Sequence, residues 1–322
     1  MPMATPAVSP RILTPRVVRI AVTGSLLLPH WGFGQQSLPD VTITPVRGGV
    51  SVVRIAQPDG TTIGANAVLL ATTDGSYLID TNLPVPPLTG LLRRSVEQAA
   101  VGRLSRVVVT HWHPDHSGGI AGFSTDVPVA AHVNVQRRLS EATEGVDLVR
   151  PGSRFTASPR PPAGLPTEVL TDSVVWQVGA ETVTAVHYAR SHTDGDLVVF
   201  FREADVVAMG DLYWPGAFPS IDIVNGGTAV GLMTSLEAIL ERTSTNTRFV
   251  SGHGPVTDRT PLEEAVAMLH ATIGQVRERK ALGASLATVQ TDGLDGDWSS
   301  WETPLVPEAQ WIKLIYESLP EA

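Results

Sequence analysis

Three histidines and an aspartate lie within the six positions 111–116, in a segment that directly follows the apolar run RVVVT at 106–110. Side chains with this spacing would diverge from a continuous strand or helix. They converge when the chain turns at the end of a buried strand, and Pro114, Gly118 and Gly119 are typical of such a turn. The segment therefore predicts a buried strand that delivers titratable side chains to one end of a sheet.

Short β-rich runs lie on both sides of this segment. The runs expected as strands are 50–55, 66–73, 76–80, 106–110, 173–178, 181–189, 196–201, 204–210 and 248–254. Asp74-Gly75 is a hairpin signal between two of them. Helical spacing of apolar residues occurs at 88–100, 228–243 and 260–280. Two β-rich halves, each accompanied by helices, predict one layered α/β domain with two sheets packed inside.

Two details of the later helices are also expected. Val230, Met233, Leu236 and Leu240 should form the apolar face of the helix at 228–243. Thr260 is the expected N-cap of the next helix, with a proline in its first turn. The Pro-rich stretch 151–166 reads as a loop and not as a domain linker, because candidate site residues lie on both sides of it.

Composition excludes several classes of function. The formal net charge is −9 and the pI is near 5.4, which argues against nucleic acid as a partner and leaves a small-molecule substrate. The 322 residues contain no cysteine, so any metal site must use imidazole and carboxylate groups. The sequence gives no indication of oligomeric state.

The N-terminus resembles a secretory signal. Three arginines within 11–19 precede the apolar stretch 20–28, and small residues follow at 32–34. We expect residues 1–36 to be a cleaved leader and 37–322 to form the mature domain, exported to the periplasm or secreted. The apolar stretch is too short to anchor the chain in a bilayer. A leader on a cytoplasmic protein is the alternative.

Three separated segments supply further candidate ligands. SHTDGD contains His192, MGDLYW contains Asp211, and SGHGP contains His253. Together with the H-x-H-x-D-H motif of 111–116, this order resembles the metallo-β-lactamase-fold hydrolases over about residues 45–280. The resemblance implies a four-layer αββα sandwich, followed by a C-terminal helical extension, with its site at one edge of the two sheets.

The resemblance also implies a ligand set for two Zn²⁺ ions. The first ion would be held by His111, His113 and His192, the second by Asp115, His116 and His253, with Asp211 bridging both. Imidazole and carboxylate ligands suit zinc, and a bound zinc ion lowers the pKa of water enough to make a nucleophile at neutral pH. Asp115 is the candidate catalytic residue that orients this water and carries its proton. Asp80 is the candidate acceptor for the N–H of a ligand histidine.

The expected reaction is hydrolysis of an ester, thioester, lactone or amide, with β-lactams among the candidate amides. Asp211 stands where several β-lactamases of this fold have cysteine, and this departure resembles the glyoxalase II, lactonase and phosphodiesterase branches. The alternatives are an iron-dependent oxidoreductase on the same fold and a non-catalytic metal-binding module. Carbonyl substrates are preferred over phosphoesters because no basic cluster accompanies the ligands.

The remaining polar candidates are interpreted as structural. These are His132, His187, His270, Asp172, Asp194, Asp196 and Asp222, of which Asp194 and Asp196 are expected in a turn and Asp172 and Asp222 are expected to be solvated or capping. The aromatic residues Tyr213, Trp214 and Phe218 follow Asp211 closely, so they are either substrate contacts or core.

Overall fold

Alternating apolar residues on the central strands explain why the chain folds into layers. In β3 (Ala67–Thr72), Val68 and Leu70 point toward the second sheet, whereas Leu69 points toward a helical layer. In β12 (Asp196–Phe201), Val199 faces the first sheet and Val198 faces the helices on the other side. Successive side chains of a strand point to opposite faces, so each of these strands has two apolar faces to bury.

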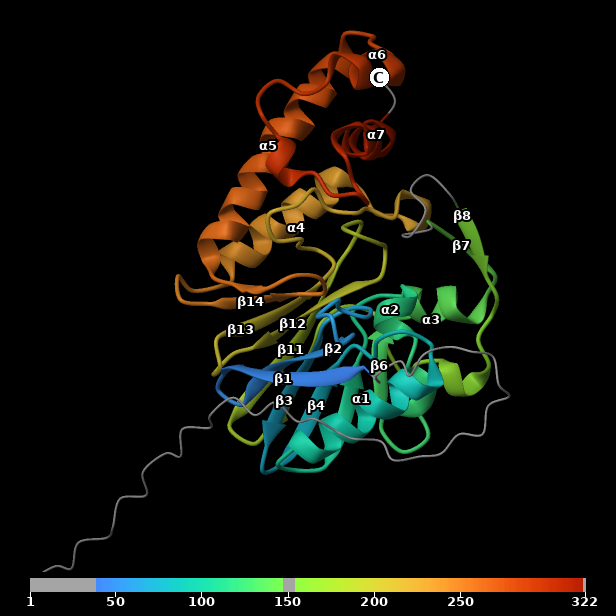
Figure 1. Ribbon diagram of the computed structural model, residues 1–322, viewed down its shortest axis with the longest axis vertical. Coiled ribbons are helices and arrows are strands. Elements are labelled where there is room, and N and C mark those ends of the chain that lie inside the picture. The colour runs from blue at the N-terminus through green and yellow to red at the C-terminus, as the bar shows by residue number, and fades with distance from the viewer. Residues whose placement is uncertain (1–38, 147–153, 321–322) are drawn as a thin grey trace, which may run out of the picture.

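The computed structural model describes residues 39–146 and 154–320 and shows two sheets between two helical layers (Figure 1). In spatial order, the first sheet contains β1 (Asp40–Arg47), β2 (Val50–Ala56), β3, β4 (Gly75–Ile79), β5 (Leu104–Val108), β6 (Val129–His132) and β9 (Glu168–Leu170). The second contains β10 (Val174–Val178), β11 (Glu181–Tyr188), β12, β13 (Val206–Gly210), β14 (Arg248–Ser251) and β15 (Val256–Thr257). A separate hairpin pairs β7 (Thr143–Val146) with β8 (Arg154–Ala157).

Helices cover the outer face of each sheet (Figure 1). The first sheet packs on α1 (Pro86–Ala99) and α3 (Val133–Ser140). The second packs on α4 (Ala229–Glu241), α5 (Arg259–Ala281), α6 (Leu286–Asp292) and α7 (Glu308–Ser318). The short helical segments are α2 (Pro114–Ser117), η1 (Ile120–Gly122), η2 (Pro162–Gly164), η3 (Ile223–Asn225) and η4 (Ser299–Trp301). The predicted four-layer αββα architecture is confirmed.

Two local predictions are wrong in detail. Helix α5 begins at Arg259 with Asp258 in the N-cap position, so Thr260 lies inside the helix and does not cap it. The buried face of α4 is partly rotated from the expected one. Met233 and Leu236 are buried as predicted, but Leu232 and Ile239 are buried too, whereas Leu240 is only half-buried. Helix α4 packs against the second sheet on one side and against α5 on another, so two of its faces are covered. The apolar spacing alone does not predict the second contact.

The predicted leader lies outside the described residues. Within residues 39–146 and 154–320, no helix is long and apolar enough to cross a membrane.

A stacked pair of histidines joins the two sheets. His132, at the end of β6, lies on His187 of β11, with ring centroids 3.7 Å apart and planes 13° from parallel. The His132 side chain also caps α3 by accepting a hydrogen bond from the Asn134 N–H. Burial and the neighbouring His187 lower the pKa of His132 from 6.5 to about 4.

This pair predicts acid sensitivity. As pH falls from about 6.5 toward 4, the unfolded chain protonates His132 before the folded chain does, so the folded state loses stability across that window. We expect His132→Asn, which keeps a capping oxygen, to show a smaller fall in Tm between pH 7 and pH 5 than the wild type. Both proteins are measured with a chelator, and the exposed His270→Asn variant is the control. Equal falls in all three proteins would contradict this role for His132.

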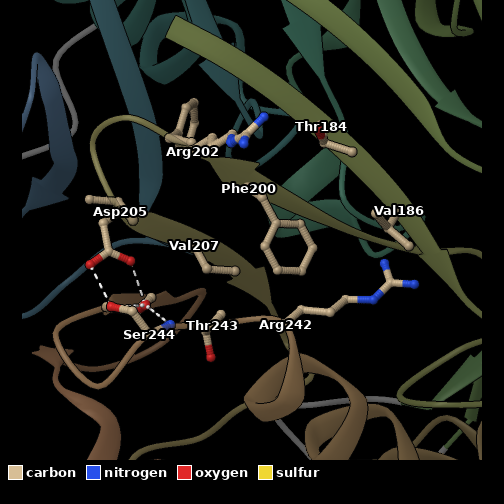
Figure 2. A pocket seen from close by; sticks show the side chains of 12 residues that line it. Thr184, Val186, Phe200, Arg202, Asp205, Val207, Arg242, Thr243 and Ser244 are labelled. Atoms are coloured by element: carbon tan, nitrogen blue, oxygen red, sulfur yellow. Dashed lines mark hydrogen bonds between the residues drawn. The ribbon is translucent and has the colours of Figure 1, made fainter.

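A hollow of about 380 Å³ opens where the second sheet meets the end of α4 (Figure 2). Phe200 lies at its centre, and Asp205 at its rim accepts hydrogen bonds from the hydroxyls of Ser244 and Thr247. None of its lining residues is a histidine, so this hollow is separate from the cluster described next.

Candidate metal centre

The seven predicted ligands come together where several strands end. His111 and His113 follow β5, whose parallel neighbour β4 ends just before Asp80. Asp211 follows β13, and His253 follows the parallel strand β14. The carboxyl ends of parallel strands lie at one edge of a sheet, which explains why residues distant in the sequence meet here. Asp115 and His116 lie in α2, and His192 lies in the loop between β11 and β12.

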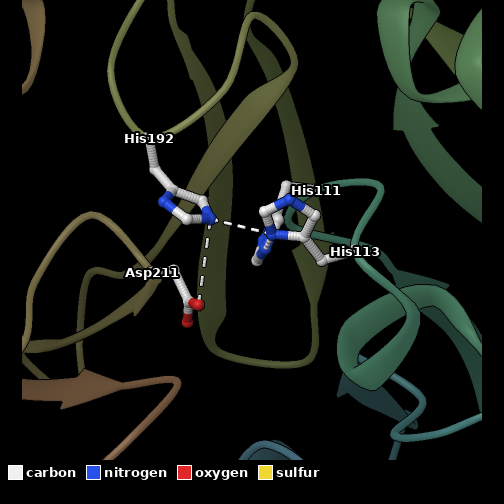
Figure 3. A group of neighbouring side chains, drawn as sticks. All are labelled: His111, His113, His192 and Asp211. Carbon is white, nitrogen blue, oxygen red and sulfur yellow. Dashed lines mark hydrogen bonds and ion pairs between the residues drawn. The ribbon is translucent and has the colours of Figure 1, made fainter. Parts of the chain in front are cut away.

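The first group consists of His111, His113, His192 and Asp211 (Figure 3). His113 Nδ1 lies 3.1 Å from His111 Nε2 and 2.9 Å from His192 Nε2. Two ring nitrogens can share one proton, but three that converge cannot all be paired in this way. Tetrahedral ligands about 2.0–2.1 Å from zinc stand about 3.3–3.4 Å apart, close to the observed spacing. The three imidazoles therefore fit a single metal ion.

The second group consists of Asp115, His116 and His253. His253 Nε2 lies 3.1 Å from Asp115 Oδ2. Asp211 connects the two groups: its Oδ1 is 3.1 Å from His116 Nε2, and its Oδ2 is 3.4 Å from His253 Nε2 and 3.9 Å from His192 Nε2. One carboxylate thus faces both groups, as a bridging ligand would.

Several buried atoms of this cluster lie close to one another but make no hydrogen bond of normal geometry with any of the described residues. They are His116 Nε2, His253 Nε2 and both carboxylate oxygens of Asp211. Buried polar atoms are normally paired, because leaving one unpaired costs about 1–3 kcal/mol. Gly252 is part of the same arrangement, since a Cβ atom there would stand 2.2 Å from Asp211 Oδ1. The chain keeps these ligand atoms unpaired and close together, which fits a bound cation.

The charge states of the first group also suit a metal. Burial and the neighbouring histidines hold the pKa of His111 well below 6.5, and burial and His113 lower that of His192 to about 4. Burial alone would raise the pKa of Asp211, but His253 and His116 hold it well below its usual range. Neutral imidazole and ionised carboxylate are the forms that bind metal. His111, His192 and Asp211 are therefore in the forms that bind metal.

The second group carries a proton that a metal must displace. Burial opposes protonation of His253, but Asp211 and Asp115 outweigh it and raise its pKa to about 9. His116 is similar: burial lowers its pKa, while Asp211, Asp115 and Asp80 raise it well above 6.5. Binding of a cation to this group is therefore coupled to proton release at neutral pH.

The predicted hydrogen bond from a candidate ligand histidine to Asp80 is present. Asp80 Oδ2 lies 2.7 Å from His116 Nδ1, and the carboxylate also accepts from the backbone N–H and the hydroxyl of Thr110. Asp80 has a φ of +66°, an unfavourable conformation for a non-glycine residue, and these three contacts hold it there. The orientation of His116 is thus fixed by a residue at the end of β4.

Asp222 has a role that the sequence interpretation missed. It caps η3, as one expected reading allowed, but it is buried and not solvated. Its Oδ2 lies 3.0 Å from His113 Nε2 and accepts a second hydrogen bond from Asn225 Nδ2. The only sequence signal was its position between two isoleucines, which indicates burial but no partner. His192 is oriented in a similar way, through a contact of 2.8 Å between its Nδ1 and the Ser220 carbonyl.

We expect Asp80→Asn to weaken zinc binding by about 10–100-fold, because groups that orient ligand histidines contribute roughly this much. Competition with a fluorescent chelator measures the affinity. Asp172→Asn, at an exposed turn, is the matched control and should bind zinc as the wild type does. Wild-type affinity in Asp80→Asn would contradict the role assigned to the His116 contact.

Apart from Asp222, the residues interpreted as structural are not among the candidate ligands. His270 pairs with Glu237, and Asp194 pairs with Arg138. Asp196 is buried and accepts hydrogen bonds from Thr193, as the expected turn requires. The expected turn of 193–195 is present between β11 and β12.

Of the three candidate aromatic residues, two belong to the core. Tyr213 and Phe218 are fully buried in the cluster between the second sheet and its helices. Trp214 differs, because it is half-buried and its ring centroid lies 4.8 Å from that of the candidate ligand His253. In the described part of the stretch 151–166, Arg160 donates to the carbonyl and hydroxyl of Ser117, so this loop contacts α2.

Comparison with known proteins identifies the class to which this fold and cluster belong. Residues 60–264 match the metallo-beta-lactamase superfamily, and the chain belongs to that superfamily. The "Probable metallo-hydrolase YqgX" of Bacillus subtilis is 28% identical over 159 residues, which cover 47% of this chain and 69% of that protein. The bovine "Acyl-coenzyme A thioesterase MBLAC2" is 29% identical over 171 residues, which cover 48% of this chain and 60% of that protein. These relatives confirm the predicted enzyme class, a hydrolase.

Solved structures show the same fold at low sequence identity. A metallo-beta-lactamase from Pontibacter korlensis aligns with a TM-score of 0.57 and 18% identity, covering 72% of this chain and 99% of that one. The FIM-1 enzyme of Pseudomonas aeruginosa in its mono-zinc form aligns with a TM-score of 0.55 and 19% identity, covering 73% and 96%. The resemblance stated from the sequence is therefore confirmed, and metal use by the His/Asp cluster is supported.

Proposed function

We propose that the chain is a dinuclear zinc hydrolase that cleaves a carbonyl bond: an ester, thioester, lactone or amide. The observation that carries this proposal is the carboxylate of Asp211. It is buried between two groups of candidate ligand atoms, and its oxygens contact His116 and His253 of one group and His192 of the other. A structural zinc site is closed and usually has four ligands, whereas seven ligands in two groups leave room for water and substrate.

The residues divide the chemistry between them. One ion would be held by His111, His113 and His192. The other would be held by Asp115, His116 and His253, and the carboxylate of Asp211 would contact both ions. When bound, zinc ions supply Lewis acidity, lowering the pKa of water and polarising the scissile carbonyl. Asp80 and Asp222 fix the orientation of His116 and His113.

Asp115 is our candidate for the proton-transfer step. Its side chain is 11% exposed, at the side of the cluster where His253 is also partly open to solvent. His116 and His253 lower its pKa despite burial, so it is ionised at neutral pH. An ionised carboxylate at this position can orient the attacking water, accept its proton and pass that proton to the leaving group.

Two observations favour carbonyl bonds as the substrate. The relatives named as acyl-coenzyme A thioesterase and as "Metallo-beta-lactamase type 2" of Bacillus cereus are named for carbonyl cleavage; the latter is 24% identical over 65% of this chain and 75% of its own length. Phosphoester hydrolases usually carry several basic groups around the phosphate, and no cluster of basic residues accompanies the candidate ligands in the sequence. Thioesters are the first substrates to test.

The test is a hydrolysis panel on the metal-reconstituted full chain. Thioesters, lactones, β-lactams and phosphodiesters are assayed with and without a chelator, and metal content is measured by elemental analysis. Chelator-sensitive cleavage of a carbonyl substrate with two zinc ions per chain supports the proposal. Iron with oxygen consumption would instead support an oxidoreductase, and a folded chain that binds no metal and cleaves nothing would support a binding module.

We also propose that residues 1–36 direct export, so that the domain acts in the periplasm or outside the cell on a small-molecule substrate. The basic and apolar segments of the leader support this. Expression of the full chain in a bacterial host, followed by fractionation and N-terminal sequencing, tests it. An intact leader on protein that stays in the cytoplasm would contradict it.

A further inference from the structure

A second hollow, of about 470 Å³, lies directly beside the candidate metal centre. One side is formed by β1, β2 and the loop 57–66, and the other by the segment 252–255. His253 lines this hollow, and its ring also belongs to the second ligand group. A molecule held here would therefore lie next to the reacting bond of a bound substrate.

The hollow contains an arginine without an acidic partner. Arg54 of β2 is half-buried, and its Nε donates to Asn66 Oδ1 at 2.8 Å and its Nη2 to the Gly254 carbonyl at 2.7 Å. Both acceptors are neutral, and no carboxylate lies within 4.0 Å of its guanidinium among the described residues. Burial without a compensating charge lowers the pKa of Arg54.

Most other partly covered arginines differ from Arg54 in this respect, the exception being Arg160, which donates only to Ser117 among the described residues. Arg47, Arg93, Arg106 and Arg138 each form an ion pair with an aspartate or glutamate. A guanidinium has five N–H donors, and the two contacts of Arg54 leave its Nη1 without an acceptor among the described residues, beside a hollow large enough for a small molecule. Such a group is suited to binding an anion from outside the protein.

We propose that Arg54 binds a carboxylate carried by the substrate, so that this hydrolase prefers substrates with a carboxylate near the scissile bond. This inference rests on the proposed hydrolase function. A single permanent charge is favoured because Arg54 is the only arginine or lysine among the lining residues. Apart from His253, which belongs to the candidate metal centre, the other side-chain donors are the neutral groups of Thr42, Thr62 and Asn66. The Asn66 amide already donates to the carbonyls of Ser251 and Gly254, so it adds no free donor for a phosphate.

A structural role for Arg54 must be separated from this binding role, because its contact with Gly254 also steadies the segment that carries His253. Two pairs of thioesters make the separation. 3-(Acetylthio)propanoate carries a carboxylate on the thiol side, and the mono-S-ethyl thioester of adipic acid carries one on the acyl side. The methyl ester of each is the neutral partner. Released thiol is easily measured, since the protein has no cysteine.

With Arg54→Gln, we expect KM for at least one acid substrate to rise about 10–100-fold, the usual effect of losing a hydrogen bond to a charged group. For Arg54→Gln, we expect the kcat on the acid substrate to stay within about threefold of wild type. The kcat and KM on the methyl ester should also stay within about threefold. Arg54→Lys should recover part of the KM, and Arg202→Gln, at an exposed position in another hollow, should change nothing. Equal losses for acid and ester would overturn the proposal and leave Arg54 with a purely structural role.

A binding measurement keeps this test independent of turnover. Adipate is titrated by calorimetry into the full chain after metal removal, and we expect at least tenfold weaker binding to Arg54→Gln than to wild type. If adipate binding depends on Arg54 but no carbonyl substrate is cleaved, the proposed hydrolysis fails while the carboxylate site stands. Equal adipate binding to both proteins, or Arg54-dependent binding of inorganic phosphate that is tighter than that of adipate, would overturn the carboxylate assignment.

Discussion

Replacing Asp211 by alanine is expected to lower kcat/KM by about 10³-fold or more, because the change removes the carboxylate that we propose as the ligand shared by both metal ions. His113→Ala should have an effect of similar size, since its Nδ1 lies at the centre of the first group. Both variants should remain folded, because the cluster lies at the edge of the sheets and outside the three apolar cores. Activity, zinc content and circular dichroism are measured together.

The isosteric variant Asp211→Asn separates charge from shape. It fills the same space, so a loss close to that of Asp211→Ala would show that the ionised carboxylate is required. Asp172→Asn serves as the control for a charge change at an exposed position. Wild-type turnover in Asp211→Ala or His113→Ala, on any substrate that the wild type cleaves, would reject the ligand assignment.

The part of the site that could be predicted is the part encoded locally. His111, His113, Asp115 and His116 lie within six residues, and a turn after a buried strand is sufficient to bring them together. The role of Asp80 could be predicted for a similar reason. Asp80 follows β4, and the parallel neighbour of β4 is β5, which leads into the segment 111–116. In both cases a single local element determines where the side chain lies.

The contacts that could not be predicted depend on distant packing. Asp222 meets His113 across 109 positions of sequence, and no spacing rule predicts that encounter. The unpaired state of Arg54 is also invisible in the sequence, since it depends on which residues of 252–255 fold back over β2. The same reason explains the rotated face of α4, which packs on two neighbours at once.

Trp311→Ala is expected to destabilise the protein by about 3–5 kcal/mol, the usual cost of removing a large buried aromatic side chain. Trp311 of α7 is fully buried, and its indole N–H donates to Thr272 Oγ1 of α5 at 3.0 Å. Its ring also stacks on Phe218, with centroids 5.6 Å apart and planes 16° from parallel. The substitution therefore leaves a cavity at the junction of two helices and the loop after Asp211. Urea denaturation of the metal-free protein measures the change.

The C-terminal helices are part of the fold that supports the site, and matched variants test this point. Trp298→Ala should lower the free energy of unfolding clearly less than Trp311→Ala does. Trp298 is half-buried, and its indole N–H donates only to the nearby Asp295 carbonyl. Trp311→Phe should lie between the two, because it keeps most of the packing and loses the hydrogen bond to Thr272. Because Phe218 lies between Asp211 and Asp222 in the sequence, Trp311→Ala should also weaken zinc binding in the protein that remains folded, whereas Trp298→Ala should not. Equal losses of stability in Trp311→Ala and Trp298→Ala, with unchanged zinc affinity in both, would show that α7 is an appendage with no part in holding the metal-binding loop.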